Sequence, residues 1–282
     1  MGRFLILFII CFSFLPYHSQ TDTIRLKTRN GGSVYFSAGF TRVWFLKSDI
    51  HFEDHSNRYH AATGNNNDYD FTVYNVTAHD RPDFDKIPDI INFTVPQFAY
   101  RLGYYFNNKA DLGVEINYDH TKYIVDDYQR VHIKGQFNGN YVDKDTTLDP
   151  VNFLHFEHSD GANFLLFNFL KRWKFLDKPD RINIGWVAKA GVGMVIPRTD
   201  VTLFGERLNN DFHIAGWMSG VETGLRTEFM RHAFFEFVGK FSYADYRNVL
   251  VLGKGNGKAN HHIFAYQLTA QLGVTVGMKK KK

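Results

Sequence analysis

The sequence predicts an all-β protein: an antiparallel transmembrane β-barrel of about eight strands, with short periplasmic turns and long extracellular loops. Three observations lead to this prediction. The chain begins with a short apolar segment, it contains long stretches in which apolar and polar residues alternate, and the connections between these stretches alternate between short and long. Proteins that cross a membrane with strands combine these features.

The first 19 residues have the pattern of a secretory signal peptide. Arg3 is followed by an uncharged, mostly apolar run at residues 4–15, which Pro16 ends. This run is shorter than the roughly 20 residues of a membrane-spanning helix. We therefore expect a signal peptide at residues 1–19, the barrel at 20–278 and a lysine tail at 279–282. A buried N-terminal helix is the alternative.

Charge and cysteine content exclude several classes of function. Without Arg3 and the four C-terminal lysines, the basic count falls from 33 to 28, against 29 acidic residues. A nucleic-acid-binding body should carry a basic face, so no nucleic acid is expected as a partner. Cys11 is the only cysteine and lies in the predicted signal peptide. The mature chain therefore has no disulfide, no cysteine-ligated metal and no cysteine nucleophile.

Alternation with a period of two residues predicts the strands. In the best example Leu112, Val114 and Ile116 fall on one face, and Glu115 and Asn117 fall on the other. A helix would mix these two sets, because its period is 3.6 residues. Eight segments show this pattern, at residues 33–46, 94–106, 110–124, 161–175, 181–196, 212–229, 232–246 and 262–278.

The connections predict which end of the barrel carries the loops. Residues 107–109, 176–180 and 230–231 are short turns. The other connections are long, at residues 47–93, 125–160, 197–211 and 247–261. An even strand count returns both chain ends to the rim with the short turns. Within the long loops, residues 70–77 and 129–136 are expected to extend strands above the membrane.

Alternation does not by itself say which face points inward, and a soluble barrel with an apolar interior is the alternative. The polar face is rich in small residues and the apolar face is bulky and aromatic, which favours an apolar face toward lipid. On this interpretation Ile116→Arg costs about 2–4 kcal/mol at the bilayer midplane, while Asn117→Ser in the lumen is nearly neutral.

The charged residues of the polar face then form an ion-pair network in the lumen. Its predicted members are Arg101, Glu115, Lys189, Glu222, Arg226, Glu236 and Lys240, with Glu228 as a further partner. Opposite charges should associate there, because a lone charge in a narrow lumen is costly. A structural plug is the first interpretation, and a gate or ion path is the alternative.

The architecture resembles the small eight-stranded bacterial outer-membrane barrels of the outer membrane protein A and X type, in the style of Bacteroidota proteins. Residues 271–278 resemble the C-terminal signal of such barrels, except that Met278 replaces the terminal aromatic residue and four lysines follow. An ordinary half-buried strand is the alternative. The resemblance implies the outer membrane of a Gram-negative cell, contact with outer-membrane lipid and lipopolysaccharide, and the barrel-assembly machinery as a partner.

One polar segment contains the residue types of nucleophilic catalysis. It holds His155, Glu157, His158, Ser159 and Asp160. Neighbouring strand residues point to opposite faces, so an extended segment would keep the imidazole of His158 from the hydroxyl of Ser159. The segment resembles lipid A-modifying barrels only in its location, because the spacing of two between His and Ser in the barrel lipid A deacylase is missing. A hydrogen-bonded loop base is the alternative.

No metal and no cofactor are expected. Imidazoles that could bind zinc or copper occur in two of the long loops, beside several carboxylates, but their spacing matches no closed site. The residues concerned are His51, His55 and His60 with Glu53 and Asp54, and His261 with His262. We expect a barrel with a structural or binding role, whose long loops engage a partner protein, a host surface or lipopolysaccharide. A lipid A-modifying enzyme and a narrow passive pore are the alternatives.

Overall fold

The computed structural model describes residues 31–56, 68–80, 97–106, 111–137, 139–158, 160–178, 181–230, 232–253 and 256–277. Most of these residues lie in strands, and the strand pairings are all antiparallel. The predicted all-β antiparallel class is therefore confirmed. Among the residues just given, no helix is long and apolar enough to cross a membrane. The predicted signal peptide and lysine tail lie outside them.

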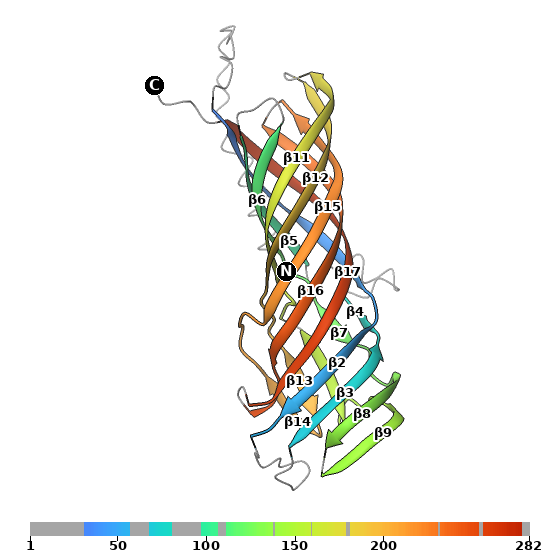
Figure 1. The fold of residues 1–282 in the computed structure, drawn as a ribbon. Coiled ribbons are helices and arrows are strands. Elements are labelled where there is room, and N and C mark those ends of the chain that lie inside the picture. Colours follow the sequence, from blue (N-terminus) through green and yellow to red (C-terminus); the bar gives the residue numbers. More distant parts are fainter. Residues whose placement is uncertain are drawn as a thin grey trace, which may run out of the picture.

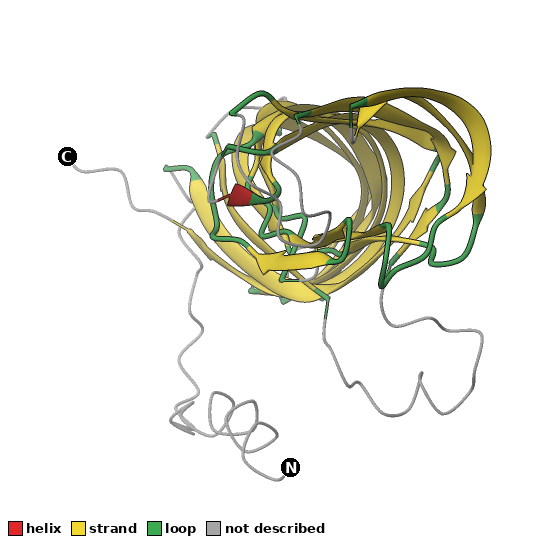
Figure 2. Ribbon diagram, turned by 90° about the horizontal axis from the view of Figure 1, so that it is seen from below, coloured by secondary structure: helices red, strands yellow, loops and turns green. Residues whose placement is uncertain are grey.

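Eight strands follow one another around a ring, which we call the strand ring (Figure 2). They are β1 (Ser33–Phe45), β5 (Phe98–Tyr105), β6 (Leu112–Asp119), β11 (Phe164–Lys178), β12 (Ile182–Val195), β15 (Gly216–Phe229), β16 (Ala233–Leu250) and β17 (Lys258–Gly277). Each pairs with the next, and β1 also pairs with β17, from Ser33 opposite Gly277 to Phe45 opposite Ala265. Each of the eight predicted segments overlaps one of these strands, and β11, β16 and β17 extend beyond the segments predicted for them.

The strand ring is apolar outside and polar inside. On β6, Val114 and Ile116 are 36% and 43% exposed, whereas Glu115 and Asn117 are 3% and 0% exposed. The same alternation runs along the other ring strands, because successive side chains of a strand point to opposite faces. A soluble barrel has the reverse arrangement, with its apolar side chains in the interior.

The remaining strands form a second body at one end of the strand ring, which we call the cap (Figure 1). Part of the cap continues the large sheet beyond β17, and the rest is a separate sheet of five strands. The continuation consists of β2 (Ser48–Asp54), β3 (Tyr69–Val76), β8 (Arg130–Phe137) and β9 (Asn140–Thr147). The separate sheet consists of β14 (Glu206–Asn209), β13 (Asp200–Leu203), β10 (Leu154–His158), β7 (Tyr123–Val125) and β4 (Ala78–His79).

The cap has an apolar core, as a soluble β-sandwich does. On β2, Ile50 and Phe52 are buried, while His51 and Glu53 face outward. Phe71 lies at the centre of an aromatic cluster, with its ring centroid 5.3 Å from that of Phe52. The facing rule, by which we mean which side chains point inward, is therefore reversed: the strand ring has polar side chains inside, and the cap has apolar side chains inside.

One predicted strand is corrected. Residues 110–124 are not one strand: β6 ends at Asp119, and β7 begins at Tyr123 in the other sheet. The chain changes sheets because the backbone N–H of Lys122 donates to Asp80 Oδ1 at 3.1 Å instead of continuing the β6 pairing. The described parts of the long loops contain strands, and β3 and β8 lie close to the strands predicted at residues 70–77 and 129–136.

Phe71→Ala should unfold the cap while sparing the strand ring. Removing a buried phenylalanine typically costs about 3–5 kcal/mol, and the cap core shares few side chains with the lumen. We expect limited proteolysis to cut the variant within the cap, with heat-modifiable gel migration of the protein retained. Tyr141→Ala, which removes an exposed side chain of β9, is the matched control and should stay resistant. Equal proteolysis of both variants would contradict this description of the core.

Candidate functional site

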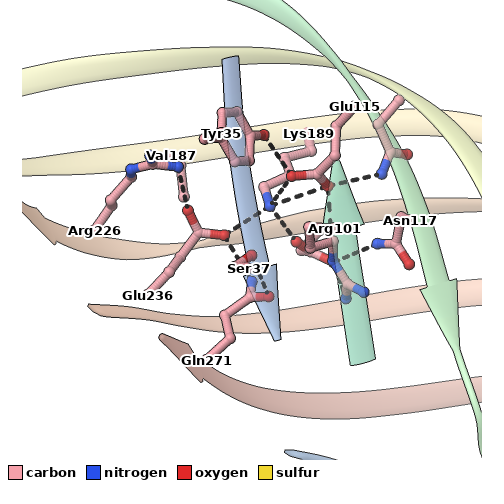
Figure 3. Close-up of polar contacts among 12 residues, drawn as sticks. Tyr35, Ser37, Arg101, Glu115, Asn117, Val187, Lys189, Arg226, Glu236 and Gln271 are labelled. Atoms are coloured by element: carbon pink, nitrogen blue, oxygen red, sulfur yellow. Dashed lines mark hydrogen bonds and ion pairs between the residues drawn. The ribbon is translucent and has the colours of Figure 1, made fainter. Parts of the chain in front are cut away.

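The strand ring brings all seven predicted lumen residues together in its interior; Figure 3 labels five of them. They are Arg101, Glu115, Lys189, Glu222, Arg226, Glu236 and Lys240, each at most 4% exposed. Every one comes from the inward face of a ring strand, so the period-two pattern that forms the strands also sets the positions of the charges.

Lys189 on β12 is the centre of the network. Its Nζ lies 2.9 Å from Glu115 Oε2 and 2.8 Å from Glu222 Oε1. A third carboxylate, Glu236 Oε1, lies 2.7 Å away. The three partners come from β6, β15 and β16, so one ammonium group joins four strands.

Two ion pairs cross the full width of the lumen. Lys240 on β16 pairs with Asp119 on β6, and Arg101 Nη2 on β5 lies 3.6 Å from Glu222 Oε2 on β15. In each case the two strands are four positions apart in the eight-strand order, which is the maximum separation around the strand ring. Arg101 also pairs with Asp119, with Nη1 2.6 Å from Oδ1. The side chains therefore meet across the middle of the lumen.

Arg226 fills the lumen toward the end away from the cap. Its guanidinium pairs with Glu236 at 3.4 Å and with Glu228 at 3.1 Å. The guanidinium carbon also lies 3.4 Å from the ring centroid of Phe234 and 4.5 Å from that of Tyr35. Aromatic faces attract cations, so this end of the lumen is filled by aromatic rings around the guanidinium as well as by ion pairs.

The central network is balanced in charge. Four cations (Arg101, Lys189, Arg226 and Lys240) face four carboxylates (Glu115, Asp119, Glu222 and Glu236). Neutral groups satisfy further carboxylate oxygens: Tyr35 donates to Glu115 Oε2 at 2.5 Å, and Gln271 donates to Glu236 Oε1 at 3.0 Å. Buried ions are tolerated only when they are paired and hydrogen-bonded in this way.

Sequence reasoning missed Asp119 as a partner, although it lies on the inward face of β6, the same face as Glu115. Tyr35 and Arg172 were also missed, because the faces of their strands were not assigned. The predicted neutrality of Asn117→Ser is corrected. Asn117 Oδ1 accepts from Lys240 at 3.2 Å and its Nδ2 donates to Glu222 at 3.3 Å, so this side chain belongs to the network.

The predicted catalytic segment does not assemble as one unit in its described part. His158 is buried and its Nδ1 contacts Thr199 Oγ1 at 2.9 Å. His155 pairs with Asp127 at 2.8 Å, and its Nε2 lies 3.8 Å from Glu157. Asp160 pairs with Arg198 at 2.6 Å. Ser159 lies outside the described residues.

His158 instead forms a buried pair with His261, which lies in the part of β17 that pairs with β2 in the cap. The two Nε2 atoms are 3.2 Å apart, and Tyr246 stacks on both imidazoles. Burial away from water lowers the pKa of His158 well below its ordinary value, with the neighbouring His261 acting in the same direction. Burial likewise lowers the pKa of His261 to about 3. Both imidazoles are therefore neutral at physiological pH.

The predicted metal candidates lie on both faces of β2. On the outward face, His51 Nε2 lies 3.6 Å from Asp70 and 3.8 Å from Glu53, and His55 Nε2 lies 3.5 Å from Asp70. Asp54 is buried on the opposite face of β2. Within the described part of the chain, no group of three or more His, Cys, Asp or Glu side chains could hold a metal ion. His60 lies outside that part.

The chain resembles solved bacterial outer-membrane β-barrel proteins. Neisserial surface protein A matches with a TM-score of 0.32 and 10% identity, over 86% of this chain and 96% of that one. OprG from Pseudomonas aeruginosa matches with a TM-score of 0.39 and 10% identity, over 88% and 97%. The outer membrane protease OmpT from Escherichia coli matches with a TM-score of 0.36 and 11% identity, over 88% and 98%. No protein-family model and no curated protein matches the sequence.

Lys189→Met should destabilise the strand ring by about 3–5 kcal/mol, because it leaves three buried carboxylates without their shared cation. Urea unfolding in detergent, followed by heat-modifiable gel migration, measures the loss. The matched control is Lys134→Met, which breaks the exposed 3.2 Å pair with Asp143 on the cap and should change stability little. Equal losses in the two variants would show that the lumen network contributes no more than a surface pair.

The cap should lose stability as the pH falls below about 6.5, because the unfolded chain then binds protons that the buried His158 and His261 do not. The loss should be about 2 kcal/mol per histidine between pH 7 and pH 5. The groups facing the pair are the uncharged Thr199, Tyr123 and Tyr246, with His213 beside His158 and His262 beside His261 as ionisable neighbours.

Thermal unfolding of the cap at both pH values checks this expectation. The double variant His158→Phe/His261→Phe keeps the aromatic packing and should show a smaller pH dependence than the unmodified protein. An unchanged pH dependence in the double variant would contradict the assignment.

Proposed function

We propose that the strand ring is an eight-stranded transmembrane β-barrel of the outer membrane, that its ion network is a plug, and that it carries the cap outside the cell as a rigid binding surface. The observation that carries this proposal is the facing of the strand ring, apolar outside and charged inside. Exposing this bulky apolar face to water would be unfavourable, whereas an outer face in contact with lipid hydrocarbon has to be apolar.

The outer face has the layout of a membrane-spanning band. Trp44 and Trp217 lie near the cap end of their strands, and Trp173 and Trp186 lie near the other end. Tryptophan is enriched at both edges of a membrane. On β15 the apolar face runs from Trp217 to Phe229, a length that corresponds to roughly 30 Å for a strand tilted as in known barrels.

Two outward cations of the strand ring fit the same boundaries. Arg42 lies over the Trp44 ring, with its guanidinium carbon 5.3 Å from the centroid. Lys171 Nζ lies 5.1 Å from the centroid of Trp173. Long basic side chains near the edges of a membrane reach toward the headgroups, so both positions are compatible with the proposed band.

The lumen contacts favour a plug over a pore. An ion moving along the lumen would have to separate the pairs that cross its full width, between Lys240 and Asp119 and between Arg101 and Glu222. Eight-stranded barrels have an interior just wide enough for side chains to fill. We therefore expect the protein to conduct no steady current in a planar bilayer.

The cap is the part available to a partner. Its outward face on β8 and β9 is charged, with His132 lying 2.9 Å from Asp143 and 3.0 Å from Asp145. A folded, charged surface above a membrane suits recognition of a partner protein through polar contacts. The enzyme alternative gains no support from His155, His158 and Asp160, since each is engaged with a different partner.

Export and assembly complete the proposal. Residues 1–19 would direct secretion, and residues 271–278 would be read by the barrel-assembly machinery. The direct test is fractionation: the protein should enter the outer membrane, resist SDS without boiling and conduct no steady current in a planar bilayer. A protein that fractionates as soluble and melts without heat-modifiable migration would overturn the membrane assignment.

Ile116→Arg should cost about 2–4 kcal/mol in assembly, because it places a charge in the middle of the lipid-facing band. Ile116→Ala at the same position should assemble nearly as well as the unmodified chain. Folding into vesicles, followed by gel migration without boiling, compares the two. Efficient assembly of Ile116→Arg would show that this face meets water.

A further inference from the structure

A polar cluster lies on the outer surface where the apolar band ends and the cap begins. Trp217 on β15, Asp245 on β16 and His262 on β17 are directly paired across the three strands. Tyr243 and Phe264 lie one outward position closer to the middle of the strand ring, and Arg247 lies one outward position closer to the cap. The cluster therefore lies where the apolar outer face of the strand ring gives way to the polar outer face of the cap.

Asp245 is the buried centre of this cluster. It is 2% exposed although its side chain points outward, because its neighbours cover it. Trp217 Nε1 donates to Oδ2 at 2.9 Å and Arg247 Nε donates to Oδ2 at 2.6 Å. His262 Nδ1 lies 3.1 Å from Oδ1. The Asp245 carboxylate thus positions the Arg247 guanidinium and the His262 imidazole side by side. Its negative charge is already engaged by these two groups.

The far sides of those two groups remain directed toward solvent. The side chains of Arg247 and His262 are 68% and 65% exposed. Arg247 contacts Asp245 through Nε, which leaves its two terminal amino groups without a partner among the described residues. His262 contacts Asp245 and Tyr243 OH through Nδ1, the latter at 2.9 Å, which leaves Nε2.

His262 can donate from Nε2 in two of its forms. In the neutral form with hydrogen on Nε2, Nδ1 accepts from Tyr243. In the charged form Nδ1–H donates to Asp245 and Nε2–H is still present. A guanidinium with two free amino groups beside an imidazole N–H forms a fork of donors that matches the oxygens of a phosphate.

An apolar groove begins at the same cluster and runs along the outer face of the strand ring. Its volume is about 560 Å³. Its lining includes the aromatic side chains of Phe167, Phe169, Phe241 and Tyr243 and the aliphatic side chains of Ala190 and Val221. Tyr243 belongs to both features, because its aromatic ring stacks on the His262 imidazole with centroids 5.9 Å apart. The hydrogen-bond donors of Arg247 and His262, which could bind an anion, therefore lie next to an apolar groove that could hold an acyl chain.

We propose that this cluster and groove bind a phosphate-bearing membrane lipid, with the phosphate on Arg247 and His262 and an acyl chain in the groove. This inference rests on the proposed function, since the groove meets lipid only if the strand ring spans a membrane. A phosphate alone would use the donors and leave the groove empty. The adjoining apolar channel is the reason for assigning a lipid instead of a free phosphate ion.

The test is native mass spectrometry of the purified protein in detergent, with bisphosphorylated lipid A as the probe. The double variant Arg247→Gln/His262→Gln should bind lipid A about tenfold or more weakly, as expected for the loss of charge-assisted hydrogen bonds. Val221→Trp, which fills the groove and leaves the donors in place, should also weaken binding.

The chain offers a matched control on the cap, Arg130→Gln/His132→Gln, which removes the same residue types from an exposed face and should leave lipid A binding unchanged. Equal binding by the Arg247/His262 variant and the unmodified protein would overturn the site. Displacement of lipid A by inorganic phosphate at equal concentration, or full binding by Val221→Trp, would overturn the lipid assignment.

Heat-modifiable migration of each variant separates these outcomes from the proposed function. A wild-type protein that migrates as a folded barrel but does not bind lipid A contradicts only this inference. A wild-type protein that never folds into a membrane contradicts the proposed function itself.

Discussion

The charges buried inside the strand ring are the constraint on which the rest of the structure depends. A shift of one residue in any ring strand would exchange its two faces. On β16 such a shift would move Lys240 to the outside and Phe241 into the lumen, and an unpaired charge in hydrocarbon costs several kcal/mol. Pairs that join opposite strands, such as Lys240 with Asp119, extend this constraint around the whole strand ring. The network therefore specifies register, whatever its net contribution to stability.

The same strands follow two opposite rules along their length. On β17, Phe264 and Tyr266 face outward beside the lumen-facing Gln267, whereas His262 faces outward beside the buried His261. The facing rule thus reverses between Phe264 and His262. In the proposed function, the ring below this point has hydrocarbon outside and paired charge inside, and the cap above it has water outside and an apolar core inside. A continuous strand such as β17 transmits rigid support from the strand ring to the cap.

Local pattern predicted the strand ring well because each ring strand is long enough to show its alternation. The facing of Ile116 and Asn117, and the inward position of all seven lumen charges, follow from that pattern alone. The cap could not be predicted in the same way. Its strands are short, with only three residues in β7 and two in β4, and their sheet depends on partners distant in sequence.

The side-chain sites show the same division between local and non-local information. Asp119 could have been found by counting charges on the inward face of β6, since four cations need four carboxylates. The pairing of His158 with His261 joins residues 103 positions apart, and no local spacing indicates it. The cluster around Asp245 also depends on register across three strands, so its members were visible in the sequence only as separate polar residues.

The central claim is that the outer face of the strand ring meets lipid, and tryptophan fluorescence tests it most directly. All four tryptophans of the chain, Trp44, Trp173, Trp186 and Trp217, are on ring strands with their side chains exposed on the outer face. In vesicles containing brominated phospholipid, we expect strong quenching of the tryptophan emission and weak quenching by aqueous iodide. Strong quenching by iodide with no effect of the brominated lipid would contradict the account.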